Sequence, residues 1–408
     1  MVTLILAGEA IFFLPFVIAR VFRPTLLDVF GISNLELGIA FSAYGVVAML
    51  SYFPGGPLAD RYGARKLMSI ALVSTAIGGL VMASVPTFTT LVWLYAVWGL
   101  TTVLIFWAAL IRATRHWGGE TSQGTAFGLL DGGRGLVAAM IGSIAVALFA
   151  SWLPDDVAAA SPADRSTAFG QIIVFFTAVV FLSAVLVWIK LPGETEGGGG
   201  DDRRSPLSGV IHTAKMPVVW LQAVIVVCAY VAYKGLDDVS LYAKEVLAMD
   251  EVSAAYASTI SMWIRPPAAV LAGWIADRVR VSTVTAVCFT LLTVGSGVIA
   301  TGVLRPSLPS LFFATIIPTS AAVFALRGLY FAIMREGEVP FRYTGSAVGI
   351  VSAIGYTPDI FMGPLMGWLL DRRPGPVGHQ YVFAVIAAFS LLGLLATLAF
   401  HRNTNRRS

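Results

Sequence analysis

Charged residues are scarce in this sequence of 408 residues. Asp, Glu, Lys and Arg make up 12% of it, whereas an ordinary soluble domain carries roughly 25%. Hydrophobic residues make up 57%, and the mean hydropathy is +0.81. A water-soluble globular protein is therefore excluded. The 27 Lys and Arg exceed the 23 Asp and Glu only slightly and are dispersed, so the basic patch that a nucleic-acid-binding protein needs is missing.

Cysteine and histidine are also rare. Cys228 and Cys288 lie in apolar runs far from any histidine or carboxylate cluster, which excludes a disulfide framework and a zinc site. The four histidines stand in expected loops or at helix ends, without the spacing of metal ligands. We therefore expect no metal and no cofactor. We also expect no enzyme, because the sequence lacks a constellation of nucleophile, metal or cofactor residues.

Long apolar runs dominate instead. A helix that spans a bilayer needs about 20 mostly apolar residues, and twelve such stretches can be delimited. They lie near 3–26, 35–56, 67–85, 88–112, 124–152, 168–190, 216–243, 252–275, 281–303, 308–334, 343–370 and 379–401. The first lacks a charged leader and a small-residue cleavage site, so we expect a spanning helix there rather than a signal peptide. The sequence predicts an all-α membrane protein with twelve transmembrane helices.

Lys and Arg are distributed unevenly over the expected loops. Sixteen of the 27 fall on the side that holds both termini, and six fall on the other side. Cytoplasmic loops are enriched in Lys and Arg, so we expect both termini in the cytoplasm and the chain in a bacterial inner membrane. The glycine-rich polar stretch 192–214 predicts a flexible cytoplasmic linker. It separates a six-helix bundle at 1–191 from a second bundle, with a short tail, at 215–408.

One loop element occurs twice, at matching places in the two halves. The loop after the second stretch reads GPLADRYGARK, from Gly56 to Lys66, and the loop after the eighth reads GWIADRVR, from Gly273 to Arg280. The first copy matches the signature G-x-L-A-D-R-x-G-x-R-K of the major facilitator superfamily at every fixed position. The chain therefore resembles that family along essentially its whole length.

The resemblance implies a fold and a mechanism. Two six-helix bundles would be related by an axis along the membrane normal, and a substrate at the midplane would be exposed to each side in turn. It assigns Asp60 to a charge relay with basic residues and the neighbouring end of the eleventh spanning helix. This relay latches the outward-facing state. The same gating category contains Arg61, Arg65, Lys66, Arg112, Asp277 and Arg278. Arg327, near the cytoplasmic end of the tenth stretch, is expected in the inner gate.

Two segments resemble particular branches of the family. The segment from Tyr230 to Val246 is similar to the organophosphate:phosphate antiporters and their anion-transporting relatives. In those antiporters, one arginine on the first spanning helix and one on the seventh clamp the phosphate. Here Arg20 stands about one turn from the first arginine position, and Tyr233, followed by Lys234, occupies the second. The run from Gly345 to Asp371 is similar to a neighbouring bacterial branch that is poorly characterised.

Five basic residues remain inside the expected spans. They are Arg20, Arg134, Lys234, Arg265 and Arg327. A charge at this depth costs at least about 2.5 to 3.5 kcal/mol, so each needs a partner or a role. Arg265 and Arg134 should lie near the midplane, given a rise of about 1.5 Å per residue. Because arginine forms a bidentate fork to carboxylate, phosphate or sulfonate groups, we expect substrate contacts from Arg265, Arg134, Arg20 and Lys234.

Internal ion pairs are the alternative for these residues. Asp131 stands three residues before Arg134, on the same helix face, whereas Arg265 has no carboxylate close to it in sequence. Arg20 and Lys234 could pair with any of Glu9, Asp237, Asp238 and Asp359. Glu9 and Asp359 are equally candidates for proton coupling, because a desolvated carboxylate can exchange protons near neutral pH, and Asp131 is a third candidate. Tyr233 and Tyr356 stand next to deep charges and are expected in the substrate site.

These observations together predict a secondary active transporter of a small organic anion. A carboxylate, phosphate ester or sulfonate would move by alternating access, either coupled to protons or in exchange for a counter-anion. We expect a monomer whose other contacts are with the lipid bilayer. Two alternatives stay open: an exporter or uniporter of a neutral or cationic compound, in which the basic residues are all paired internally, and a receptor built on the same scaffold.

Overall fold

The computed structural model describes residues 1–119, 123–193, 211–276, 278–339 and 344–405, and these residues form helices, turns and loops without a strand. In the N-terminal half the helices are α1 (Val2–Ala10), α2 (Ile18–Val21), α3 (Arg23–Phe30), α4 (Asn34–Arg61), α5 (Ala64–Ala83), α6 (Phe88–Gly99), α7 (Ala108–Gly118), α8 (Gln123–Trp152) and α9 (Pro162–Lys190). In the C-terminal half they are α11 (Pro217–Gly235), α12 (Val239–Glu245), α13 (Glu251–Ala276), α14 (Val281–Ala300), α15 (Pro309–Leu329), α16 (Thr344–Gly355), α17 (Pro358–Arg372) and α18 (Pro376–Asn405).

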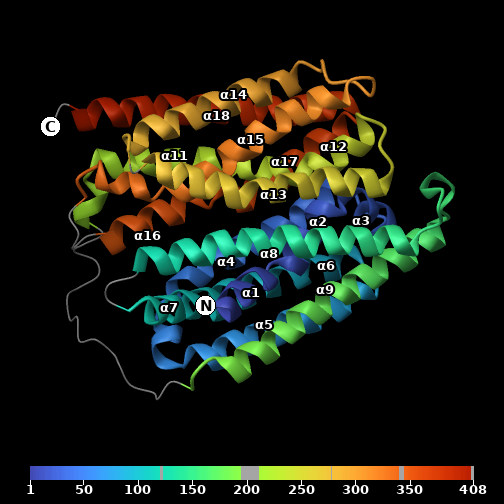
Figure 1. The fold of residues 1–408 in the computed structure, drawn as a ribbon, viewed down its shortest axis with the longest axis horizontal. Helices are drawn as coiled ribbons and strands as arrows, with labels where there is room; N and C mark the ends of the chain where they lie inside the picture. Colours follow the sequence, from blue (N-terminus) through green and yellow to red (C-terminus); the bar gives the residue numbers. More distant parts are fainter. Residues whose placement is uncertain (120–122, 194–210, 277, 340–343, 406–408) are drawn as a thin grey trace.

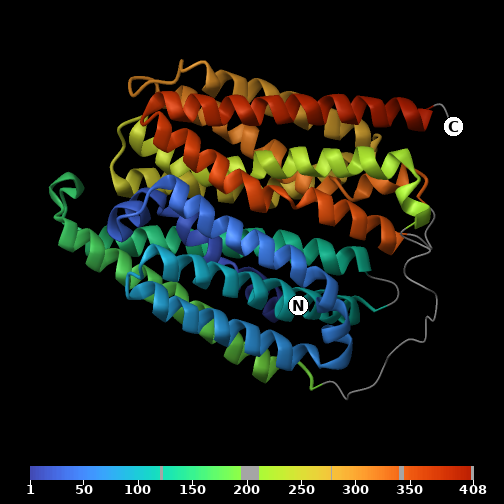
Figure 2. The ribbon, with the colours of Figure 1, turned by 180° about the vertical axis from the view of Figure 1, so that it is seen from behind.

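The helices form two bundles that lie side by side. The N-terminal helices, blue to green, make one bundle, and the C-terminal helices, yellow to red, make the other (Figures 1 and 2). The predicted all-α membrane fold with two bundles is therefore confirmed. The boundaries proposed for the bundles remain predictions, because most of the linker, residues 194–210, lies outside the described part of the chain.

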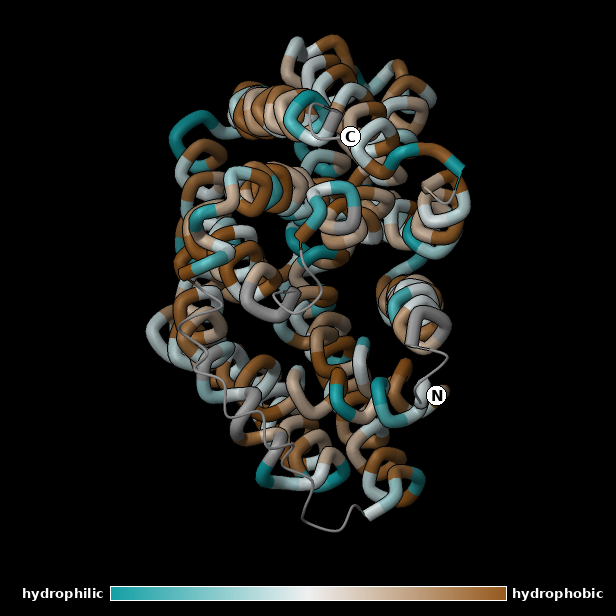
Figure 3. Tube along the Cα trace, turned by 90° about the vertical axis from the view of Figure 1, so that its left-hand side faces the viewer, coloured by the Kyte–Doolittle hydropathy of each residue, from teal (hydrophilic) through white to brown (hydrophobic). Residues whose placement is uncertain are grey.

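Many large apolar side chains lie on the outside of the molecule. Leu80, Trp93 and Val294 are among the exposed ones, and the helices on the outside of the bundles carry many hydrophobic residues, drawn in brown in Figure 3. In the described residues, nine helices are long and apolar enough to cross a membrane, or ten when the bent pair 2–10 and 13–21 counts as one span. An apolar exterior of this extent suits a bilayer rather than water.

Several predicted spans are interrupted where they face the interior. The first contains a π-helix, Phe13–Val17, and the fourth contains another, Leu100–Trp107. The eleventh divides into α16 and α17 just before Pro358, because proline lacks the backbone N–H that a continuous helix would use and its ring clashes with the preceding turn. Such irregular backbone is tolerated at membrane depth only where it contacts protein or lines a cavity.

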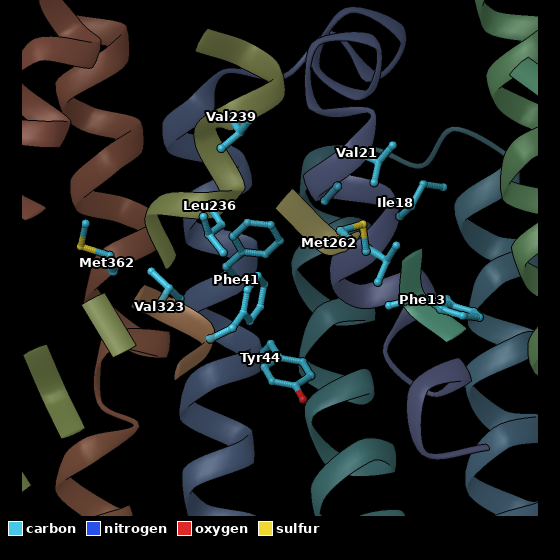
Figure 4. Packing of buried hydrophobic residues seen from close by; sticks show 14 of the residues in the cluster. Phe13, Ile18, Val21, Phe41, Tyr44, Leu236, Val239, Met262, Val323 and Met362 are labelled. Atoms are coloured by element: carbon cyan, nitrogen blue, oxygen red, sulfur yellow. The ribbon is translucent and has the colours of Figure 1, made fainter. Parts of the chain in front are cut away.

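The two bundles contact each other mainly in the half of the molecule that lies away from both termini. There α4 packs against α17 and α8 packs against α13. A Cβ atom added to Gly45 would lie 2.6 Å from the backbone carbonyl oxygen of Asp359, so only glycine permits this approach. Trp263 donates a hydrogen bond of 2.9 Å to Ser143 across the second contact. Figure 4 shows buried apolar side chains of both bundles, among them Phe41 and Leu236. We call this half the closed end.

Candidate functional site

A cavity of about 130 Å³ lies between the two bundles. Helices of both bundles contribute to its wall, which is rich in tyrosine and in charged side chains. The lining residues are Glu9, Phe12, Phe16, Val17, Arg20, Tyr44, Gly45, Ala48, Met49, Tyr52, Val103, Trp107, Arg134, Tyr230, Tyr233, Lys234, Arg265, Arg327, Ser352, Tyr356 and Asp359. All six residues predicted to contact the substrate are among them, as are Glu9 and Asp359.

Two arginines and two carboxylates form one charge cluster at the cavity. Arg134 Nε donates to Glu9 Oε2 at 3.1 Å, and Arg265 Nη1 donates to Glu9 Oε1 at 3.3 Å. Arg265 Nη2 also donates to Asp131 Oδ1 at 3.0 Å, and the Asp131 side chain is 47% exposed. Asp131 thus pairs with an arginine of the other bundle, rather than with Arg134 one turn away. With two cations and two anions, this cluster is balanced in charge.

A second balanced cluster also lies at the cavity. Arg20 Nε donates to Asp237 Oδ1 at 2.6 Å, and Lys234 Nζ lies 3.3 Å from Asp237 Oδ2 and 3.4 Å from Asp359 Oδ1. The hydroxyl of Tyr230 donates a hydrogen bond of 2.9 Å to Asp359 Oδ2. The sequence allowed four carboxylates as partners of Arg20 and Lys234. In the structure these two cations pair with Asp237 and Asp359.

Arg327 has no carboxylate partner among the residues that the structure describes. Its Cζ lies 3.9 Å from the centre of the Tyr233 ring and 5.9 Å from that of Tyr230. Its Nη1 is buried without a hydrogen-bond partner in the same residues. Arg327 lines the cavity, and the role in the inner gate that its depth in the sequence predicts stays a prediction. Arg20 lies 4.7 Å from the centre of the same Tyr233 ring, so this ring contacts two guanidinium groups.

Tyr356 extends the aromatic lining across the interface. Its ring stacks with that of Tyr52 of the other bundle, at 6.2 Å between centres and 18° between planes. Its hydroxyl lies 3.2 Å from the hydroxyl of Tyr330. Tyr52 was not among the expected site residues. It stands eight residues after Tyr44 on α4, so the helical period of one cavity-facing stripe could have identified it.

Apart from Arg327, the predicted gating residues whose side chains the structure describes are not among those that line the cavity, and their role stays a prediction. Arg112 donates to the backbone carbonyl of Ala59. Arg65 lies 4.8 Å from the ring centre of Trp188, and Arg278 lies 3.8 Å from that of Trp274.

The remaining predicted gating residues have fewer described contacts. Arg61 lies over the ring of Tyr62, and Lys66 is exposed. Asp277 and the side chain of Asp60, and with them the predicted charge relay, lie outside the described residues.

Polar contacts between the bundles continue beyond the cavity toward the closed end. Lys244 lies 3.1 Å from Asp28 of the other bundle and 2.9 Å from Glu251. The Asp371 carboxylate accepts hydrogen bonds from the backbone N–H of Asn34, at 3.1 Å, and of Leu35, at 2.7 Å. Asp371 of α17 therefore caps the first turn of α4 across the interface. In the described residues, no group of three or more His, Cys, Asp or Glu side chains is arranged so that it could hold a metal ion.

Comparison with known proteins identifies the family. The family model described as Major Facilitator Superfamily matches residues 5–356. The chain is 26% identical over 377 residues to inner membrane protein YqcE of Escherichia coli K12, covering 91% of this chain and 86% of that protein. It is 24% identical over 412 residues to inner membrane protein YihN of the same organism, covering 99% and 95%.

A solved structure agrees with this assignment at the level of the fold. A mutant of the nucleoside transporter NupG superimposes with a TM-score of 0.76 over 98% of both chains, at 14% identity. Identity this low shows the fold alone. The family model, by contrast, covers most of the sequence and includes both copies of the repeated loop element. The chain therefore belongs to the major facilitator superfamily.

Proposed function

We propose that this transporter carries a small organic anion, namely a carboxylate, phosphate ester or sulfonate. The charge balance of the cavity supports the proposal. Arg20, Lys234, Arg134 and Arg265 are matched by four carboxylates, which leaves Arg327 as the single uncompensated cation among the described lining residues. A buried charge without a partner is costly, and an anionic substrate would supply the partner.

The rest of the lining suits the organic part of such a substrate. Tyr230, Tyr233, Tyr356 and Trp107 present rings with polar atoms at their edges, which bound a small molecule and offer hydrogen bonds to its polar groups. One chain builds the whole cavity, which supports transport by a monomer. With both termini in the cytoplasm, as the loop charges predict, the closed end would face outward and the cavity would serve the inward-facing state.

Thermal unfolding of the purified protein in detergent, measured against a panel of compounds, tests the proposal. The panel pairs carboxylates, phosphate esters, sulfonates and sugar acids with uncharged analogues of the same skeleton. A ligand that binds only the folded state raises the unfolding temperature in proportion to its occupancy. We expect stabilisation by an anion and none by its neutral analogue. Stabilisation by neutral or cationic compounds alone would instead favour the exporter or uniporter.

Among the predicted proton-coupling residues, the geometry favours Asp359. Glu9 is held by two guanidinium groups, whereas Asp359 accepts from Tyr230 and shares its cation, Lys234, with Asp237. It also belongs to the first turn of α17, just after the break in the eleventh span. Asp359 could therefore be neutralised without leaving Lys234 alone.

Asp359→Asn is accordingly expected to retain counterflow of the identified substrate and to lose proton-driven accumulation. Both are measured in proteoliposomes, with and without a pH gradient. Asp155→Asn, at an exposed loop carboxylate outside both clusters, is the control and should retain both activities. Accumulation that persists in Asp359→Asn would reject its coupling role.

A further inference from the structure

A buried histidine cluster lies at the closed end, outside the substrate cavity. His379, in the first turn of α18, is fully buried, and its Nδ1 lies 2.6 Å from Oδ2 of the equally buried Asp238. Its Nε2 lies 3.2 Å from Glu245 Oε2, and the Glu245 side chain is 34% exposed. The ring of Tyr242 packs edge-on at 5.2 Å. The cluster is thus buried at Asp238 and open to solvent at Glu245.

The geometry of this cluster requires an extra proton. A neutral imidazole has one N–H donor, whereas both ring nitrogens of His379 face carboxylate oxygens. Both contacts are hydrogen bonds only if the imidazole carries two protons or one carboxyl group carries one. Asp238 Oδ1 is already buried without a partner in the described residues, so loss of this proton would leave the cluster still less satisfied.

The same segment holds the two bundles together. Asp238 follows Asp237 in one short 3₁₀ turn, Leu236–Asp238, and Asp237 pairs with Arg20 of the other bundle at 2.6 Å. Arg23 also donates to the backbone carbonyl of Asp237 at 3.4 Å, and Ser240 donates to that of Arg20 at 2.8 Å. A shift of this turn would therefore disturb the contacts that close the end.

We propose that His379, Asp238 and Glu245 form a proton-binding site whose occupancy favours the conformation closed at this end. When the proton is bound, the imidazolium satisfies both carboxylates. When the proton leaves through Glu245 to solvent, two carboxylates share one N–H, and their repulsion displaces the turn that carries Asp237. Acid therefore favours the closed end, and rising pH favours its opening.

The other charged groups near His379 do not change the direction of this pH dependence. Asp238, Tyr242 and Glu245 are the titratable groups that contact His379 in the described residues. Lys244, next to Glu245, is engaged with Asp28 and Glu251 instead. No described cation competes with the imidazole for the two carboxylates. The switch thus depends on the protonation of these three groups.

Nitrogen-15 NMR of histidine-labelled protein tests the site directly. The sequence has only four histidines, so the signal that disappears in His379→Gln identifies His379. We expect both of its ring nitrogens to be protonated at neutral pH, and Glu245→Gln to remove the proton from Nε2. A neutral tautomer in the wild-type protein, with one unprotonated nitrogen, would overturn the proposal.

A distance measurement tests the consequence. Spin labels at Thr87→Cys and Ser307→Cys, exposed positions of the two bundles at this end, report its opening, and both native cysteines are buried. Between about pH 7 and about pH 10 the open population of wild type should rise about threefold, because the two carboxylates that face His379 favour its protonated form. The proton therefore leaves above the range, about pH 6.5, in which an unperturbed histidine changes charge. His379→Gln and Glu245→Gln should abolish the rise, whereas Asp155→Asn, at an exposed loop, should keep it. An unchanged rise in both cluster variants would refute the switch.

The two proposals can fail separately. The switch depends on the proposed function only in assuming that the two ends open in turn. Neither readout needs a substrate, so failure to find an anionic ligand leaves the test of the switch intact. Glu245→Gln removes a partly exposed group and serves if His379→Gln does not fold.

Discussion

Arg327→Gln is expected to weaken binding and uptake of the anionic substrate by about 100-fold, which is roughly 2.7 kcal/mol. The variant removes a buried guanidinium that lacks a carboxylate in the described residues and lies against Tyr233. A hydrogen bond to a charged group contributes roughly 1.5 to 3 kcal/mol, and a bidentate pair uses two of them. The dissociation constant from thermal shifts and the initial rate in proteoliposomes measure the effect.

Three comparisons make this result specific. Arg327→Lys keeps the charge but loses the planar fork, so we expect an intermediate loss of about tenfold. Arg305→Gln, at an exposed arginine in the loop after α14, should bind and transport normally. The unfolding temperature of Arg327→Gln without ligand should not fall, because no described carboxylate loses its partner. Affinity near that of wild type in Arg327→Gln would remove the main support for an anionic substrate.

Gly45→Ala is expected to lower the population of the observed closed-end conformation by about 10- to 100-fold. The added Cβ would lie 2.6 Å from the Asp359 carbonyl oxygen, and the obstructing atom is backbone that cannot rotate away. Overpacking of this kind costs roughly 1 to 3 kcal/mol, and separating α4 from α17 relieves it. The labels at Thr87→Cys and Ser307→Cys should report longer distances. Uptake should fall, since alternating access requires this end to close.

Gly128→Ala provides the matched control. It makes the same chemical change in a long helix, α8, but the added Cβ would meet no heavy atom within 4 Å. Alanine is more favourable than glycine in a helix by about 1 kcal/mol, so this variant should be at least as stable as wild type. If Gly45→Ala and Gly128→Ala gave the same distances and rates, close packing of α4 and α17 would not control the closed end.

The membrane class, the spans and the family were predictable because each depends on local sequence. Apolar runs of sufficient length and a contiguous loop signature carry that information. The breaks in the spans were harder to predict. Pro358 is a local signal for the division of α16 from α17, and Pro15 stands inside the π-helical segment Phe13–Val17. The π-helical segment Leu100–Trp107 contains no proline and has no comparable mark.

The pairing of the charges could not be predicted from the sequence. Depth arithmetic identifies five basic residues inside the spans, and the cavity is lined by all five. Arg265, which has no carboxylate nearby in sequence, receives two from the other bundle, and Glu9 is 256 positions away from it. Arg327 lacks a carboxylate in the described residues, which its place in the sequence did not indicate, and its expected role in the inner gate stays a prediction.

By itself, then, the sequence determined that this protein is a helical membrane transporter of the major facilitator superfamily, because hydropathy and a short signature are properties of neighbouring residues. Only the tertiary structure decided which cation has no described carboxylate partner and that a buried histidine faces two carboxylates. Ion pairs at membrane depth form between helices far apart in the chain, and their partners are set by how the two bundles pack.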